Sequence, residues 1–257
     1  MHDDPLTLLA HLAAALPHSG AERSFKMTHG LLLTQRILYG IDKKRMTQHT
    51  ALSLAARLHM PDGYRQILGA CHGAANFFYL GFEQDAQRSL WKWYLEFPVY
   101  VGTPQHGRPA LLYVGLKWNA VDDAPIAITH YVWRVHLPLP ELYACLGSAC
   151  GSTDSATAHC ATAVLTLAAT RTEADRLVLL EVSEPGQARR SFDLNLYAAS
   201  LTVGAVAHLL HQTAQHLAIP VPVMDALLTR IHDQPLGHLA GGLDRHNRDF
   251  LTLYYEI

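Results

Sequence analysis

Alternating apolar and polar residues recur along the chain in ten segments that fall into five pairs. Such alternation is typical of β-strands whose two faces meet different surroundings. Short polar turns join the two members of each pair, which is the pattern of a β-hairpin. The predicted strand pairs are 22–28 with 31–40, 76–83 with 89–98, 110–119 with 125–134, 176–183 with 190–198, and 236–244 with 248–255.

Helical patterns separate most of these hairpins, and Thr47 and Pro61 are suited to begin two of the helices. The predicted helices are 47–58, 61–75, 138–148, 156–171, 201–217 and 221–233. Helices between antiparallel hairpins exclude a parallel βαβ arrangement, and closure best removes the edges of a large sheet. The sequence therefore predicts an α+β fold. It is a closed antiparallel ten-stranded β-barrel built from five hairpins and ringed by helices, as a single domain over residues 1–257.

The polar faces of these strands are predicted to point inward. On segment 89–97, for example, Trp91 and Trp93 oppose Lys92 and Tyr94. In an ordinary sheet the polar face would meet water. Here the surrounding helices need an apolar surface to cover, so the polar faces must share a lumen that could hold a ligand. The lumen would collect Arg36, Lys92, Lys117, Glu22, Glu96, Glu181, Asp193, Tyr79, Tyr94, Tyr113, Tyr131, Trp133, Tyr197 and Tyr254.

These residue types suit a prenyl diphosphate. Arginine and lysine neutralise a diphosphate while tyrosine hydroxyls donate hydrogen bonds to it, and aromatic faces stabilise an allylic carbocation without quenching it. No DDxxD motif is present, and the adjacent acid pairs lie at a terminus, Asp3-Asp4, and in a turn, Asp122-Asp123. We therefore expect no bound metal and no tightly bound cofactor, with Mg²⁺ as an optional stimulant.

Composition and charge exclude several function classes. The formal net charge is −2 and no run of Lys or Arg occurs, which argues against nucleic-acid binding. The N-terminus is acidic where a signal peptide is basic, and the apolar stretch 6–16 is too short to cross a bilayer. A cytoplasmic location with no membrane partner is expected. The four cysteines form no CxxC, and GxSxG, P-loop, HExxH and GxGxxG motifs are absent.

With these features the chain resembles the ABBA prenyltransferases, whose αββα repeats form a ten-stranded barrel, and in particular the cyanobactin-type peptide prenyltransferases. AERSFKMTHGLLLTQRILYG resembles their opening hairpin, LGFEQDAQRSLWKWYLEF the second, and GGLDRHNRDFLTLYYE the last. The resemblance implies transfer of an allylic group, dimethylallyl above all, from its diphosphate to a side chain of a peptide natural product. One departure is the Pro/Gly linker 99–109, which stands where the family has helices. A wall shortened in this way would admit a linear or macrocyclic peptide.

The resemblance and the lumen pattern together suggest roles for single residues. On the family match, Glu22 lies beside the acceptor, which it orients or deprotonates, while Arg36 and Lys92 bind the diphosphate. The full prediction is Glu22 as the catalytic residue; Arg36, Lys92, Lys117, Tyr197 and Tyr254 for the diphosphate; Tyr94, Tyr131, Trp133 and Asn195 shielding the prenyl group; and Glu96, Glu181 and Asp193 for the acceptor.

Two other functions stay open at this point. A non-catalytic barrel could bind an aromatic or isoprenoid molecule in the same lumen, and a prenyltransferase could act on a small aromatic acceptor instead of a peptide. The acceptor residue, the donor length (C5, C10 or C15), the regiochemistry and the oligomeric state are not determined by the sequence.

Overall fold

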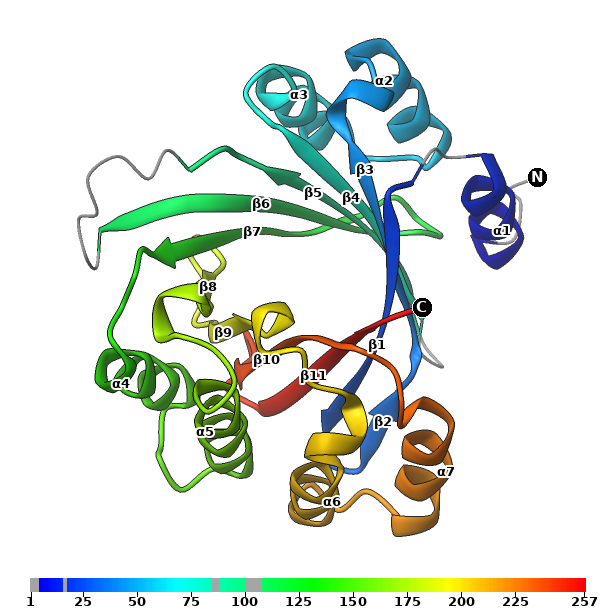
Figure 1. The fold of residues 1–257 in the computed structure, drawn as a ribbon. Coiled ribbons are helices and arrows are strands. Elements are labelled where there is room, and N and C mark those ends of the chain that lie inside the picture. Colours follow the sequence, from blue (N-terminus) through cyan, green and yellow to red (C-terminus); the bar gives the residue numbers. More distant parts are fainter. Residues whose placement is uncertain (1–4, 16–17, 85–87, 100–107) are drawn as a thin grey trace.

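The computed structural model describes residues 5–15, 18–84, 88–99 and 108–257, and within them the strands form one closed barrel (Figure 1). Neighbouring strands are antiparallel throughout, and β11 pairs with β1 to close the sheet. The strands are β1 Gly20–Thr28, β2 Leu31–Leu33, β3 Gln35–Asp42, β4 Phe77–Gln84, β5 Ser89–Glu96, β6 Pro109–Asn119, β7 Pro125–Arg134, β8 Val178–Ser183, β9 Arg190–Asn195, β10 Leu236–Leu243 and β11 Asp249–Glu256. The predicted closed antiparallel barrel is confirmed.

The second strand of the opening hairpin differs from the prediction. It was expected to run unbroken over 31–40, but it is interrupted at Thr34, where the N–H of Arg36 donates to the Thr34 carbonyl at 2.9 Å. This tight local turn removes the residue from the ladder. Because β2 and β3 pair with different halves of β1, they together occupy one strand position in the barrel wall. The described residues therefore form a barrel with ten strand positions.

The fourth hairpin is shorter than predicted at both ends. Its first strand was expected from residue 176, but residues 174–176 form a 3₁₀ turn and β8 begins at Val178. Its second strand was expected to reach residue 198. It ends at Asn195 because the Asn195 side-chain oxygen accepts the N–H of Tyr197 at 3.1 Å. Asparagine makes such turns readily, and the chain continues as a 3₁₀ turn.

The helices occupy the outside of the barrel, with α2 and α3 on one side and α4 to α7 on the opposite side (Figure 1). They are α1 Pro5–Ala15, α2 Gln48–Arg57, α3 Asp62–Cys71, α4 Leu139–Cys150, α5 Ala156–Ala169, α6 Ala207–His216 and α7 Val221–Ile231, with 3₁₀ turns at Lys43–Arg45, Ala174–Arg176, Tyr197–Ala199 and Val203–Val206. The Thr47 side chain caps α2 as predicted, by accepting the N–H of Thr50. The helix predicted over 201–217 begins late, since residues 203–206 are 3₁₀. None of the described helices combines the length and apolarity that crossing a bilayer requires.

The apolar core lies between the helices and the outer face of the barrel, in two clusters. One packs α1 to α3 against β3 to β6 and includes the fully buried Trp91 and Trp93. The other packs α4 to α7 against β1 and β8 to β11 and includes Leu251 and Leu253. Full burial of one such side chain contributes about 1.5–3 kcal/mol. The predicted strand faces are therefore confirmed for β5, whose Lys92 and Tyr94 line the lumen on the face opposite to Trp91 and Trp93.

Candidate active site

Two cavities occupy the lumen and share part of their walls. The first, which we call the basic chamber, has a volume of about 190 Å³ and is lined by Lys26, Arg36, Lys92 and Lys117 among others. The second, the tyrosine chamber, has a volume of about 340 Å³ and lies at the other end of the same strands. Four residues line both, namely Tyr94, Tyr131, Asp193 and Tyr254. The lumen is thus a basic end and an aromatic end separated by tyrosines.

One carboxylate at the centre of the basic chamber holds three cations. Glu83 on β4 forms ion pairs with Arg36 on β3, Lys92 on β5 at 2.5 Å and Lys117 on β6 at 2.5 Å. Lys92 and Lys117 are direct cross-strand partners, an arrangement that is unfavourable without an anion between them. Arg36 is further fixed by donating from Nε to the Ser24 hydroxyl at 3.0 Å. The strand register therefore concentrates positive charge around a single anion.

Burial makes this cluster sensitive to charge. Desolvation would raise the pKa of Glu83, but Arg36, Lys117 and Lys92 outweigh it and hold that pKa well below its usual range. Burial, together with the neighbouring cations, lowers the pKa of Lys92. Lys26 forms no ion pair with any described residue and points its Nζ at the Phe250 ring, 4.4 Å from the centroid. Burial first, and then Arg36 and Lys117, lower the pKa of Lys26 to about 7. A bound polyanion would raise the pKa of each of these three groups.

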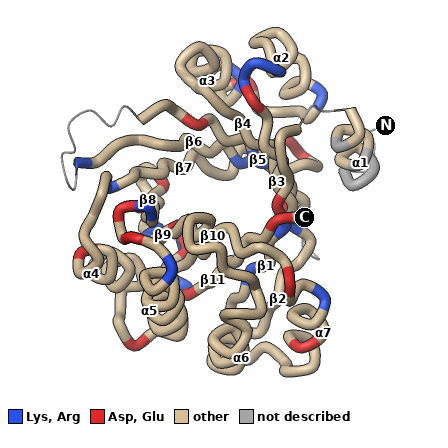
Figure 2. Tube along the Cα trace, in the orientation of Figure 1, with Lys and Arg blue, Asp and Glu red and all other residues tan. Residues whose placement is uncertain are grey.

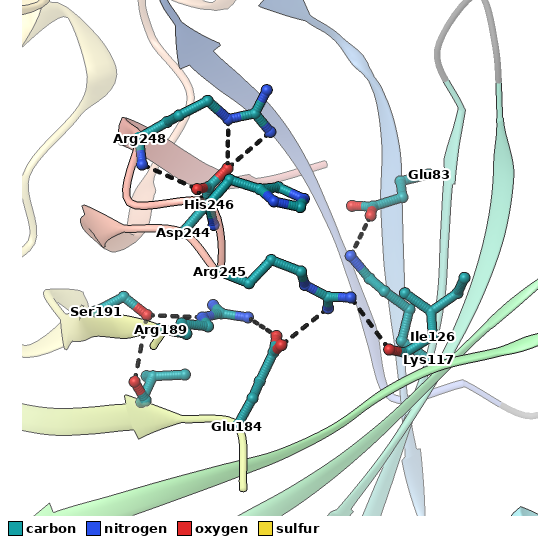
Figure 3. A network of polar contacts seen from close by, with 11 residues as sticks. Glu83, Lys117, Ile126, Glu184, Arg189, Ser191, Asp244, Arg245, His246 and Arg248 are labelled. Carbon is teal, nitrogen blue, oxygen red and sulfur yellow. Dashed lines mark hydrogen bonds and ion pairs between the residues drawn. The ribbon is translucent and has the colours of Figure 1, made fainter. Parts of the chain in front are cut away.

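Two arginines from turns close the end of the basic chamber (Figure 3). Arg189 and Arg245 both pair with the buried Glu184, at 2.7 and 2.9 Å, and Arg245 also donates to the carbonyl of Ile126 at 3.2 Å. Eight Lys and Arg side chains and four carboxylates line the chamber: Lys26, Arg36, Arg88, Lys92, Lys117, Arg189, Arg245 and Arg248 against Glu83, Glu184, Asp193 and Asp244. The excess of positive charge makes this an anion site.

Tyrosine rings in edge-to-face contact form the wall of the second chamber. Tyr113 contacts Tyr79 and Tyr131, each with centroids 5.9 Å apart, and Tyr131 contacts Tyr94 at 5.7 Å. Gly115 leaves the space for one ring, because a Cβ there would lie 2.9 Å from Cε1 of Tyr94. Edge-to-face packing fixes the rings and turns π-faces to the cavity. Such a wall favours an aromatic ligand or a carbocation.

Acidic groups gather at the mouth of the tyrosine chamber. The Tyr197 hydroxyl donates to Glu22, and a Cβ on Gly237 would approach both of these side chains within 3 Å. His238 Nδ1 lies 2.7 Å from Asp193, and its Nε2 lies 4.0 Å from Glu22. Burial alone would lower the pKa of His238, but Asp193 and Glu22 raise it to about 9. Glu22 therefore faces the cavity beside an imidazolium that Asp193 orients.

Most of the sequence-predicted residues lie where the prediction places them. The structure brings Arg36, Lys92 and Lys117 together in the basic chamber, with Tyr94, Tyr131, Asp193 and Tyr254 at the boundary and Glu22 and Asn195 in the tyrosine chamber. Glu96 is not among the residues that line either chamber, and its carboxylate accepts a hydrogen bond from the Tyr79 hydroxyl at 2.8 Å. Burial raises its pKa.

One residue is on the opposite face to that predicted, and two others lie apart from the groups that they were expected to assist. Glu181 lies on the outer face of β8, where it pairs with Arg134 at 3.2 Å, because the inward face of this strand is apolar. Trp133 lies near the end of β7 and lines neither chamber; its ring contacts His136 at 5.6 Å. Tyr197 lies beyond the end of β9 beside Glu22, so it is separated from the cations that it was expected to assist. The linker predicted at 99–109 lies mostly outside the described residues.

Several residues of the site were missed. Strand alternation gives Glu83 the same face as Tyr79 and would have found it. Alternation likewise gives Lys26 the same face as Glu22. Arg189 and Arg245 lie in turns, where alternation carries no signal, and His238 lies on a glycine-rich strand with little contrast between its faces. Among the described residues no three His, Cys, Asp or Glu side chains gather as a metal site would require.

Comparison with solved structures shows a shared architecture. The 6-dimethylallyltryptophan synthase of Micromonospora olivasterospora, solved in complex with DMASPP and Trp, aligns over 93% of this chain and 82% of its own, with 12% identity and a TM-score of 0.58. The chain has the ABBA barrel fold. A second 6-dimethylallyl tryptophan synthase aligns over 93% of this chain and 81% of its own at 10% identity and TM-score 0.56. AnaPT from Neosartorya fischeri aligns over 92% and 77% at 13% identity and TM-score 0.56. The sequence matches no protein-family model and no curated protein.

Proposed function

We propose that this ABBA barrel is a single domain and is a prenyltransferase. It would move an allylic group, dimethylallyl above all, from its diphosphate to an aromatic acceptor. The observation that carries the proposal is the junction of the two chambers. A buried cluster of cations opens, across Tyr94, Tyr131 and Tyr254, onto a cavity walled by tyrosine rings. Cations suit the diphosphate and the rings suit the carbocation, so each half of an allylic diphosphate meets a matching surface.

The proposed reaction follows the order of these residues. The diphosphate binds Arg36, Lys92 and Lys117 and takes the place of the Glu83 carboxylate among them. The C–O bond then breaks, the diphosphate keeps the electron pair, and the allylic cation faces the boundary tyrosines. The acceptor ring supplies the electrons for the new C–C or C–N bond. Glu22 accepts the proton that the acceptor loses, and Mg²⁺ serves only as an optional counter-ion of the diphosphate.

The acceptor is proposed to be a small aromatic compound such as an indole. The 6-dimethylallyltryptophan synthase with the same fold was solved with Trp, and the tyrosine chamber, at about 340 Å³, lies near the lower end of ligand-site volumes of roughly 300–1,000 Å³. The peptide acceptor predicted from the cyanobactin resemblance stays a prediction. A peptide would have to present one aromatic side chain to this chamber from the mouth of the barrel.

Mass spectrometry with donors of three lengths tests the proposal. The protein is incubated with indole compounds, or with peptides containing Trp, Tyr, His or Arg, and with C5, C10 or C15 diphosphate. The expected product is an acceptor heavier by one prenyl unit together with released diphosphate. The Arg36→Ala/Lys92→Ala double variant should form little product, and Glu181→Gln, on the outer face, should behave as wild type. Tight ligand binding without any mass increment would instead identify a non-catalytic binding barrel.

A further inference from the structure

The two ends of the lumen have opposite charge. The basic chamber is lined by eight Lys and Arg side chains, whereas no Lys or Arg is among the described residues that line the tyrosine chamber. The residues outside the described ranges cannot supply one either, since 1–4, 16–17, 85–87 and 100–107 contain neither Lys nor Arg. The tyrosine chamber instead has three carboxylates in its wall, those of Glu22, Asp193 and Glu256.

Two of these carboxylates face each other, and the His238 imidazolium, which Asp193 holds more closely, is the one cationic side chain among the described residues that line this chamber. Glu22 on β1 and Glu256 on β11 are direct partners in the antiparallel ladder that closes the barrel, so their side chains lie on the same, inward face. Like charges at directly opposed positions destabilise a sheet. His238 lies 2.7 Å from Asp193 and 4.0 Å from Glu22, so it is the closer partner of Asp193. Glu22 also accepts a hydrogen bond from the neutral Tyr197 hydroxyl, and Glu256 forms no ion pair within the described part of the chain. Figure 2 shows acidic positions beside the C-terminus, where β11 meets β1.

This charge pattern discriminates between acceptors that differ only in their side chain. An ammonium group at the mouth would lie near the Glu22 and Glu256 carboxylates and relieve their repulsion, which favours its binding. A carboxylate at the same place would meet two like charges, and the nearby His238 is already paired with Asp193. Its best electrostatic site is the basic chamber, which the donor's diphosphate occupies. In a zwitterionic amino acid the ammonium group would be attracted to Glu22 and Glu256, and the carboxylate group would be repelled by them.

We propose that the acceptor is an aromatic amine without a free carboxylate, bound in the tyrosine chamber with its cationic nitrogen between Glu22 and Glu256. The inference rests on the proposed function, because it assigns the charge of the acceptor for that reaction. It makes Glu256 a residue that determines specificity and leaves the aromatic ring to the tyrosine wall.

The test compares three indoles that share a ring and differ in charge: tryptamine, tryptophan and indole-3-propionate. Each is titrated calorimetrically into the protein saturated with inorganic pyrophosphate, and each is then assayed with dimethylallyl diphosphate. Tyramine, tyrosine and 3-(4-hydroxyphenyl)propionate form a second set with a phenol ring. The amine of a set should bind, and react by kcat/KM, at least about tenfold better than its amino acid, as expected for one charge-assisted contact. The propionate should be the poorest of each set.

In the Glu256→Gln variant, the ratio of kcat/KM for tryptamine to kcat/KM for indole-3-propionate should decrease about tenfold. Glu181→Gln, a charge change of the same size on the outer face, should leave this ratio as in wild type. Equal or better use of tryptophan or indole-3-propionate overturns the inference, as does binding of no member of either set. The proposed function fails separately, if no diphosphate binds and no acceptor of any charge is prenylated.

Discussion

Replacing Glu83 by Gln tests the reading of the basic chamber most directly. The carboxylate is the shared anion of Arg36, Lys92 and Lys117, and its side chain is 12% exposed. Glutamine keeps the shape and one acceptor oxygen but removes the charge. We therefore expect the variant to be less stable than wild type and to bind pyrophosphate more tightly, because three cations lose their partner and the competing anion is gone.

The size of both effects follows from the geometry. Removing one partner of a buried ion pair costs roughly 3–5 kcal/mol. For a chain of this size, about 2–4 °C per kcal/mol gives a Tm lower by about 6–20 °C. The loss should shrink as pH rises. Burial holds the folded-state pKa of Lys92 and of Lys117 below its ordinary value, and Glu83 is a group that raises it. Removing the Glu83 charge therefore lowers both pKa values further, so stability rises more steeply with pH in the variant than in wild type.

Thermal unfolding and calorimetry with inorganic pyrophosphate measure both effects. The Kd for pyrophosphate should fall by at least about tenfold in Glu83→Gln, as for the release of one charge-assisted contact. Saturating pyrophosphate, at about a hundred times Kd, should return about 2.7 kcal/mol of stability. Glu181→Gln is the matched control and should lose less than about 1 kcal/mol, since its pair with Arg134 is exposed. A wild-type Tm together with unchanged or weaker pyrophosphate binding would refute the reasoning.

Three further predictions concern the proposed reaction. Arg36→Ala or Lys92→Ala should weaken binding of the donor by about ten- to a hundredfold, the effect of one charge-assisted contact, measured as Kd for a non-reactive donor analogue; unchanged values would place the diphosphate elsewhere. Glu22→Gln should lower kcat by roughly 10²–10⁴-fold with the donor Kd nearly unchanged, and loss of donor affinity alone would remove Glu22 from acceptor chemistry. Because the folded-state pKa of His238 is raised to about 9, the folded chain holds the extra proton between pH 6.5 and 9. Stability should therefore fall as pH rises through that window, and His238→Gln should remove this slope in urea unfolding.

Much of the barrel could be predicted because alternation is a direct consequence of strand geometry. Lys92 lies between Trp91 and Trp93, which pack against the helices, so its side chain has to point the other way. By the same alternation Glu22 lies on the face of its strand opposite to Phe25 and Met27. Where both faces of a strand are apolar, the argument fails. β8 buries Leu179 outward and Leu180 inward, so its one acidic residue, Glu181, gave no information about direction, and the inward assignment was wrong.

The charge balance of the site could not be derived in the same way. Arg189 and Arg245 come from turns between strands, and turn residues are ordinarily exposed. Here they fold over the end of the barrel because the buried Glu184 holds both of them. The contact of Glu184 with Arg245 joins residues far apart in the sequence, and no local pattern predicts it. The sequence predicted a basic lumen. It could not predict which cations are already paired with a carboxylate, because those pairs depend on the register between β3, β4, β5 and β6.

The direction of the charge gradient has a consequence for the proposed chemistry. Cations lie at one end, tyrosines at the boundary, and the carboxylates Glu22 and Glu256 at the other end. If a donor binds as proposed, the basic chamber would hold the diphosphate when the C–O bond breaks, and the allylic cation would be attracted toward the acidic end, where we propose that the acceptor binds. Charges separated along the barrel in this way recombine less readily, since each has a compensating partner fixed in advance by the fold. In the proposed reaction the acceptor's proton would be released at the acidic mouth beside Glu22, away from the cations that would have to stay protonated to bind the diphosphate.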